Sequence, residues 1–255
     1  TSFIDELEAY THRLNLFKEG LKNFPIIDIK DIINESININ QTYFLHVDGK
    51  INWIFKPASM NEKGGEIVQA ECTASQLNYH HQFPIPLTIS IKIKDWIGSA
   101  QVYVENTKKL TEIETEGIPI DRDELQKLAI FDLLFANSDR NDENFIFQYS
   151  NDLARIVGID HDRCLMFKQI EELKMDYLQH KEMRQPINEE LRHLFSSDAI
   201  QAYKVIMMNN EVPHQMLAWV DTVEEALNKA IENKIPLKVV VLRLQKEYKT
   251  MFLEY

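Results

Sequence analysis

The sequence predicts an α+β protein with a mainly β first part, which holds one key helix, and a mainly helical second part. Runs rich in β-branched and aromatic residues concentrate before residue 105, whereas apolar residues at helical spacing dominate after residue 120. With 255 residues, of which 44% are hydrophobic and 27% charged, the chain can bury a core of ordinary size. We therefore expect a helical extension at 1–41, a small lobe at 42–106 and a larger lobe at 107–255.

The net charge and the cysteine content exclude several classes of protein. The chain carries 28 basic and 40 acidic side chains, a formal charge of −12, which opposes binding to nucleic acid and to anionic lipid. Two cysteines, Cys72 and Cys164, are too few for a disulfide framework or a thiolate metal site and suit a reducing compartment.

The sequence also lacks targeting signals. No apolar run approaches the roughly 18 residues that span a bilayer, and no secretory signal opens the chain. We therefore expect a cytoplasmic protein without an integral membrane segment and without a nucleic-acid partner. Delivery into a host cell, as for a bacterial effector, would leave no signal in this sequence.

The first segments predict a helix followed by a β-hairpin. Residues 3–24 repeat apolar side chains at three- and four-residue steps, which is typical of an amphipathic helix. A shorter segment of mixed polarity follows to about residue 40. Residues 42–58 contain two β-rich runs joined by Asp48 and Gly49, a dipeptide typical of tight hairpins.

Between residues 61 and 105 the sequence predicts a loop, a helix and two strands. The loop at 61–66 leads into a helix whose apolar face consists of Ile67, Ala70, Ala74 and Leu77. Residues 84–93 and 99–105 are rich in β-branched side chains and are predicted as strands.

The second part opens with a polar connector that contains Gly117 and Pro119. Residues 121–138 then predict a strongly apolar helix. Acidic side chains occupy its first turn, where the helix dipole favours negative charge.

A short hairpin and a helical tail complete the second part. Residues 145–149 and 154–160 are predicted as strands on either side of a turn at residues 151–152. From about residue 166 the pattern is mainly helical, with a candidate β segment at 237–242.

Basic side chains follow the predicted hairpin at Arg163, Lys168 and Lys174, and again within residues 180–185. A substrate could dock on these charges. However, several acidic residues are interleaved with them, namely Glu171, Glu172, Asp176 and Glu182. This mixture favours a solvated surface over a docking site.

Three polar residues occur where apolar segments begin or end. Asp139 and Asn144 lie five residues apart on a loop between the apolar helix and the first strand, and Asp160 ends the second strand. A hairpin would bring them to one edge of a small sheet. Mg²⁺ prefers oxygen ligands of this kind, often one or two carboxylates with substrate phosphates, and a further carboxylate can orient a hydroxyl nucleophile.

The composition of this loop also suggests two other interpretations, a solvated turn and a calcium-binding loop. Asn and Asp also populate ordinary solvated turns, because their side chains hydrogen-bond to their own backbone. A calcium-binding EF-hand loop is excluded, since it needs Gly at its sixth position and Glu at its twelfth, where Asn144 and Ser150 stand.

The motif D-x-x-x-x-N, followed by an apolar strand that ends in Asp, resembles the catalytic core of the protein-kinase-like fold. The segments SDRNDENFIF and GIDHDRCL are most similar to the phosphatidylinositol 3- and 4-kinase-like branch, of the bacterial or actin-fragmin-kinase type. Upstream, FKP at 55–57, AECTASQL at 70–77 and PIPLT at 84–88 resemble that branch in the same order. The resemblance covers residues 42–167 and implies a two-lobed, kinase-like fold.

This resemblance implies a chain that binds ATP together with Mg²⁺ or Mn²⁺. Lys56 would contact the α- and β-phosphates and would be held by an ion pair with Glu71. Asn144 and Asp160 would hold the metal ion, and Asp139 would orient or deprotonate the acceptor hydroxyl. In phosphoryl transfer most of the catalysis comes from such positioning and charge neutralisation.

The resemblance also assigns the remaining nucleotide contacts. The backbone groups of Tyr103, Val104 and Glu105 would bind the adenine. The glycine-rich phosphate loop is reduced to Gly49, so few backbone amides would be left to bind the phosphates.

Two features depart from the pattern or leave it ambiguous. Asp162 stands where the branch has a glycine after the metal motif, so it could be a further metal ligand or could disturb the loop. Glu66 competes with Glu71 as the partner of Lys56, although the helical register favours Glu71.

The function that these residues predict is an ATP- and Mg²⁺-dependent kinase that phosphorylates a hydroxyl group. A protein serine or threonine is preferred over a lipid as acceptor, because of the acidic charge and the lack of a membrane segment. The open alternatives are a phosphoinositide kinase, a nucleotidyl transferase, and a kinase-like pseudoenzyme that acts as a binding module or effector.

Overall fold

The computed structural model describes residues 29–32, 42–47, 50–58, 62–93, 96–168 and 170–254. The chain forms two compact units. The first contains the described residues up to His80 together with Pro86–Val104, and the second contains His81–Ile85 and the chain from Glu105 onward. The predicted helix at 3–24 lies outside the described residues.

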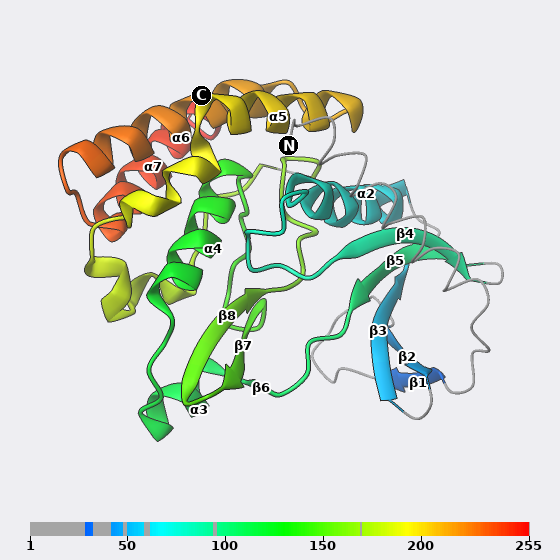
Figure 1. Ribbon diagram of the computed structural model, residues 1–255. Helices are drawn as coiled ribbons and strands as arrows, with labels where there is room; N and C mark the ends of the chain where they lie inside the picture. Colours follow the sequence, from blue (N-terminus) through cyan, green and yellow to red (C-terminus); the bar gives the residue numbers. More distant parts are fainter. Residues whose placement is uncertain are drawn as a thin grey trace. The chain divides into compact units, whose positions relative to one another are not determined.

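The first unit contains an antiparallel sheet in the order β1-β2-β3-β5-β4 (Figure 1). Its strands are β1 (Ile29–Ile32), β2 (Thr42–Val47), β3 (Lys50–Pro57), β4 (Thr88–Ile93) and β5 (Trp96–Val102). The two β-rich runs predicted at 42–58 are strands β2 and β3, and they pair antiparallel. Residues 48–49 between them lie outside the described part.

Helix α2 (Glu62–Leu77) packs against strands β4 and β5. Ala70, Ala74 and Leu77 are fully buried, as expected for its apolar face, and the small alanines permit close contact with the sheet. The loop predicted at 61–66 is wrong, because the helix already begins at Glu62. Glycine lowers helix propensity by about 1 kcal/mol per residue, and packing of the rest of the helix outweighs that preference here.

The second unit contains a three-stranded antiparallel sheet in the order β6-β7-β8, formed by β6 (Thr107–Lys108), β7 (Phe145–Ser150) and β8 (Leu153–Gly158). Asn151 and Asp152 join β7 to β8 with φ angles of 51° and 59°. This pair of left-handed residues suits a two-residue hairpin turn, because its twist matches that of the strands. The predicted hairpin is therefore confirmed.

Helix α4 (Arg122–Leu134) is the apolar helix expected at 121–138. Asp121 caps it by accepting hydrogen bonds from the backbone N–H groups of Asp123 and Glu124, at 3.0 and 3.2 Å. The polar connector before it contains a further short helix, α3 (Leu110–Glu116), in which Glu112 accepts a hydrogen bond from the backbone N–H of Lys109.

The tail is helical, as Figure 1 shows. Three 3₁₀ helices, η1 (Asp176–Gln179), η2 (Lys181–Arg184) and η3 (Glu189–Phe195), precede α5 (Ser197–Asn209), α6 (Gln215–Glu232) and α7 (Leu237–Phe252). The β segment predicted at 237–242 is wrong, because these residues form the first turns of α7. Their β-branched side chains suggested a strand, but the buried positions of α7 recur at three- and four-residue steps: Leu237, Val240, Val241, Leu244 and Tyr248.

Trp219 on α6 connects three helices of the second unit. Its side chain is fully buried, and its indole Nε1–H donates a hydrogen bond of 2.7 Å to the carbonyl of Leu133 near the end of α4. Its ring also packs edge-on against Tyr248 and Phe252 of α7, with centroids 5.0 and 6.1 Å away. The tail is thereby attached to the helix that precedes the polar loop.

Replacing Trp219 should destabilise the second unit strongly. We expect Trp219→Ala to lower the free energy of unfolding by about 3–5 kcal/mol through loss of packing. Trp219→Phe should lower it by about 1–3 kcal/mol, because the carbonyl of Leu133 loses a buried donor. Leu242→Ala, which changes a side chain of α7 that is 49% exposed, should stay within about 0.5 kcal/mol. Urea denaturation measures all three, and equal values for Trp219→Phe and Leu242→Ala would contradict the prediction.

Candidate active site

Lys56 and Glu71 form an ion pair in the first unit. Lys56 lies on β3 and Glu71 on α2, and Lys56 Nζ is 3.1 Å from Glu71 Oε1. The Glu71 side chain is only 2% exposed, and its second oxygen accepts a hydrogen bond from the Ser99 hydroxyl on β5. A buried carboxylate needs such partners to offset its lost hydration. Glu66, the other candidate partner, is exposed.

The residues predicted to bind adenine follow strand β5. Tyr103 and Val104 are half-buried, Glu105 is exposed, and the chain passes from the first unit to the second between Val104 and Glu105. Gly49, the remaining glycine of the predicted phosphate loop, lies outside the described residues. The roles of Lys56 and of these residues toward ATP stay predictions.

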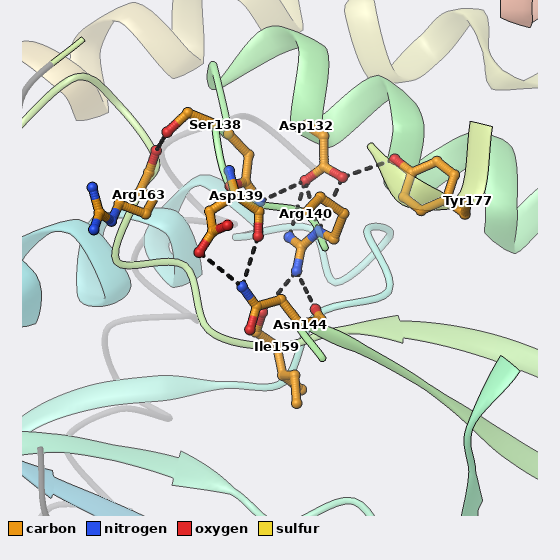
Figure 2. A network of polar contacts seen from close by, with 9 residues as sticks. Asp132, Ser138, Asp139, Arg140, Asn144, Ile159, Arg163 and Tyr177 are labelled. Atoms are coloured by element: carbon orange, nitrogen blue, oxygen red, sulfur yellow. Dashed lines mark hydrogen bonds and ion pairs between the residues drawn. The ribbon is translucent and has the colours of Figure 1, made fainter. Parts of the chain in front are cut away.

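In the second unit, Asp139 and Asn144 contact each other. The Asn144 amide nitrogen donates hydrogen bonds to the backbone carbonyl of Asp139 at 2.6 Å and to Asp139 Oδ2 at 3.2 Å (Figure 2). Asn141 Nδ2 donates to the other carboxylate oxygen of Asp139 at 2.9 Å. Because the Asn144 nitrogen is turned toward Asp139, its amide oxygen faces away and is the atom suited to bind a cation.

Asp160 follows strand β8 beside the start of β7. The last strand pair is Phe145 with Gly158, and the backbone N–H of Ile159 donates to the carbonyl of Asn144 at 3.0 Å. Asp160, the next residue, has a φ angle of 58°, in the left-handed region that Asp adopts more readily than most residues other than glycine. The hairpin thus brings the backbone before Asp160 to Asn144, as the sequence predicted.

Arg140 holds these two segments together from the interior of the unit. Its side chain is fully buried, and one guanidinium nitrogen donates to the carbonyls of both Asn144 and Ile159, the latter at 2.7 Å (Figure 2). These carbonyls belong to one predicted metal ligand and to the residue before the other. Arg140 therefore fixes the spacing between the backbones that carry Asn144 and Asp160.

The charge of Arg140 is balanced by Asp132 on helix α4. The Arg140 Nε and second terminal nitrogen donate to the Asp132 carboxylate at 2.9–3.2 Å, and both side chains are fully buried. Asp132 also accepts from the Tyr177 hydroxyl at 2.8 Å and from Asn137 Nδ2 at 3.0 Å. Burial opposes the charge on Arg140, but Asp132 outweighs this effect and raises the Arg140 pKa, so the guanidinium stays charged.

No role was predicted from the sequence for Asp132, Arg140 or Tyr177. The sequence contains a signal for Asp132, because this residue interrupts the apolar run LAIFDLLF. A charge that is buried in such a run needs a polar or oppositely charged partner. The partner could not be predicted, since Tyr177 is 45 residues away along the chain. The solvated-turn interpretation applies only to the tip of the loop, where Asp142 and Glu143 are exposed.

Asp162 is paired with Lys168 in the segment after Asp160. Lys168 Nζ is 2.6 Å from Asp162 Oδ2, and the two side chains are 16% and 19% exposed. The segment is anchored to the loop, because the carbonyl of Arg163 accepts a hydrogen bond from the backbone N–H of Ser138 at 3.3 Å (Figure 2). The sequence left open whether Asp162 is a metal ligand, and the structure gives its carboxylate a cationic partner.

The donor set fits a magnesium ion that is shared with a nucleotide. Among the described residues, no three His, Cys, Asp or Glu side chains cluster as a metal site. Mg²⁺ is commonly held by only one or two carboxylates, with phosphates and water completing its shell. The Asn144 amide oxygen and the Asp160 carboxylate, on adjacent backbones, match that requirement. Their role as metal ligands stays a prediction.

Comparison with known proteins finds kinases. No family model matches the sequence. A phosphatidylinositol 4-kinase gamma 4 from Oryza sativa subsp. japonica is 32% identical over 95 residues, which is 37% of this chain and 16% of that protein. The chain thus spans about a sixth of the relative's length, and the relative's activity enters only as a proposal.

Two solved kinase structures are also similar to the chain. The Helicobacter pylori proinflammatory kinase CtkA has a TM-score of 0.44 and 14% identity, over 88% of this chain and 99% of that one. The Rio2 kinase of Chaetomium thermophilum, in an ADP/Mg²⁺-phosphoaspartate complex, has a TM-score of 0.39 and 12% identity, over 93% and 75% of the two chains. TM-scores of this size assign no role to any residue of this chain.

The kinase-like resemblance predicted from the sequence is confirmed by the match to the phosphatidylinositol 4-kinase. The α+β class is confirmed by the structure, with a mainly β unit that contains helix α2 and a mainly helical unit. Among the described residues, no helix is long and apolar enough to cross a membrane.

Removing Arg140 should collapse the predicted metal-binding edge. Arg140→Met leaves the Asp132 carboxylate buried without its cation, so we expect a loss of about 3–5 kcal/mol in the free energy of unfolding. The double variant Asp132→Asn/Arg140→Met should lose less than the sum of the two single changes, since it leaves no charge unpaired.

A surface arginine provides the control. The Arg155 side chain is 59% exposed, and its Nε is 3.7 Å from Asp121 Oδ2. Arg155→Met should therefore change the free energy of unfolding by no more than about 1 kcal/mol. Denaturant titration compares the variants. Additive losses at Asp132 and Arg140 would show that the pair is not coupled.

Cys164 should be unreactive in the folded protein. Burial raises the pKa of its thiol well above the ordinary value. The charge of Arg140 lowers this pKa and the charge of Asp132 raises it, but burial has the largest effect. We expect no modification by a thiol reagent at pH 8 in a Cys72→Ser background until the protein unfolds. Because unfolded thiols ionise above about pH 8.5 and the folded one does not, Cys164 should also contribute a loss of stability as pH rises through that range. Rapid native modification would contradict this.

Proposed function

We propose that the chain is a kinase that transfers the γ-phosphate of ATP to a hydroxyl group with the help of Mg²⁺. The observation that carries the proposal is the contact of Asp139 with Asn144, on a backbone that Arg140 holds beside the residue preceding Asp160. The Lys56–Glu71 ion pair of the first unit supports it. The match to a phosphatidylinositol 4-kinase supports the same reaction class.

Each residue has a chemical task in this proposal. Asn144 and Asp160 hold the metal ion, which neutralises phosphate charge when it is bound. Lys56, kept in position by Glu71, contacts the phosphates of ATP. Asp139 accepts a hydrogen bond from the acceptor hydroxyl and orients its oxygen for attack. Its carboxylate is half-buried and already positioned by Asn141 and Asn144.

A protein serine or threonine is the acceptor that we propose first. The chain has a formal charge of −12, and a negatively charged surface is repelled by anionic lipid bilayers. The basic residues after Asp160 give no clear headgroup site, because Arg163 and Lys168 are paired with Glu171 and Asp162.

A phosphoinositide is the second candidate acceptor. The match to a phosphatidylinositol 4-kinase favours it specifically. A hydroxyl on an inositol ring would need the same orientation by Asp139, so the residue roles proposed above do not separate the two acceptors.

Substitution of the proposed residues should separate their roles. With γ-labelled ATP and Mg²⁺, we expect Asp160→Ala and Lys56→Met to abolish phosphate transfer. Asp139→Asn should reduce the rate by about 10²–10⁴-fold while nucleotide binding remains, because it removes only help to the hydroxyl. Asp142→Asn is the matched control, as Asp142 is exposed on the same loop, and it should keep full activity.

The acceptor is tested with the same labelled ATP. A serine- and threonine-containing protein and phosphoinositide vesicles are offered in parallel. Label on the vesicles alone would overturn the protein preference, and label transferred from α- rather than γ-labelled ATP would indicate nucleotidyl transfer. Nucleotide binding without transfer to either acceptor would support the binding-module alternative.

A further inference from the structure

Asp162 places a second carboxylate two residues beyond Asp160. Lys168 holds it with an Nζ–Oδ2 distance of 2.6 Å, and both side chains are more than four-fifths buried. Exposed ion pairs contribute little, because solvent screens them and the long side chains must be ordered. A pair that is largely removed from water interacts more strongly, so it can fix where a carboxylate lies.

The backbone around Asp162 is fixed as well. The N–H of Cys164 donates to the carbonyl of His161 at 3.2 Å and closes a turn around Asp162. The N–H of Leu165 donates to the carbonyl of Phe135 at 2.8 Å, just beyond the end of helix α4. The backbone of Asp162 is therefore held in position after Asp160, so the negative charge of its carboxylate has to be balanced there.

Asp160 and Asp162 are two residues apart in the chain; burial raises the pKa of the nearby Cys164 thiol, and the charges of Asp162 and Asp160 add to this effect. Two carboxylates in one neighbourhood repel each other and attract the same cation. Without the charge of Lys168, Asp162 would add a negative charge and further oxygen ligands next to Asp160. A divalent ion would bind more tightly there, but it could move from the position set by Asn144 and Asp160.

We propose that Lys168 is a positioning residue that keeps Asp162 out of the metal's coordination shell. Asp160 is then the carboxylate of this strand end that binds the ion, and the pair contributes no net charge. The inference rests on the proposed function, because it concerns the same metal ion. It also accounts for an aspartate at the position where the resemblance leads one to expect a glycine.

The charge argument predicts an ordered series of metal affinities. Lys168→Met should bind Mg²⁺ about tenfold more tightly than the wild type, because it removes the positive charge that Lys168 places beside the Asp162 carboxylate. Asp162→Asn should bind it more weakly, since Lys168 is then uncompensated. The double variant Lys168→Met/Asp162→Asn should return to the wild-type affinity, because the net charge returns to zero.

The readout is the Mg²⁺ concentration that gives half-maximal thermal stabilisation by a non-hydrolysable ATP analogue. Turnover is measured beside it, and we expect Lys168→Met to lower kcat and the double variant to restore it. A purely structural pair would lower the melting temperature in every variant without producing the opposite shifts in Mg²⁺ affinity.

Arg163→Met is the matched control. Arg163 belongs to the same segment and pairs with Glu171 at 3.1 Å, but the two side chains are 35% and 44% exposed. Solvent screens this pair, so its loss should leave the Mg²⁺ dependence within about twofold of the wild type.

The outcomes separate this inference from the proposed function. If the wild type shows no Mg²⁺-dependent stabilisation by the analogue, both fail. If the wild type responds and Asp160→Asn does not, but Lys168→Met leaves the Mg²⁺ affinity unchanged, only the role of Lys168 is overturned. If Asp162→Asn loses metal binding as completely as Asp160→Asn, Asp162 is itself a ligand and the inference is wrong. Should Lys168→Met fail to fold, the weaker binding predicted for Asp162→Asn still tests it.

Discussion

The buried ion pair between Asp132 and Arg140 is the contact on which the candidate active site depends. Neither charge could remain in the interior alone, because the loss of hydration would cost several kcal/mol per ion. Together they are satisfied, and the donors that Arg140 has left bind the carbonyls of Asn144 and Ile159. One guanidinium therefore joins helix α4, the polar loop and the end of strand β8 into a single arrangement.

Charge compensation recurs at three acidic residues of the two units. Glu71 is paired with Lys56, Asp132 with Arg140 and Asp162 with Lys168. In each pair at least one side chain is mostly buried, so the interaction is screened less than on the surface. Asp139, by contrast, is held among the described residues by the amide groups of Asn141 and Asn144. This difference is consistent with the separate role proposed for Asp139.

Local patterns predicted much of the second unit correctly. The acids at the start of α4, the turn at Asn151 and Asp152, and the spacing of Asp139 and Asn144 are features of a few neighbouring residues. The same kind of reasoning was wrong for residues 237–242. Their β-branched side chains favour a strand locally, but burial of α7 against α6 decides their conformation. Tertiary packing overrides an intrinsic preference of a few tenths of a kcal/mol per residue.

The sequence alone therefore determined the α+β class, the order of most elements and the positions of the polar residues in the loop after α4. The pair of Lys56 with Glu71 was expected from the resemblance, but only the tertiary structure decided the partners of Asp132 and Asp162. Asp132 meets Arg140 and Tyr177, and Asp162 meets Lys168. Sequence patterns report which side chains must be buried or solvated, since that depends on residue type and spacing. Which charges meet depends on how distant segments pack, and that information is not contained in any short stretch of the chain.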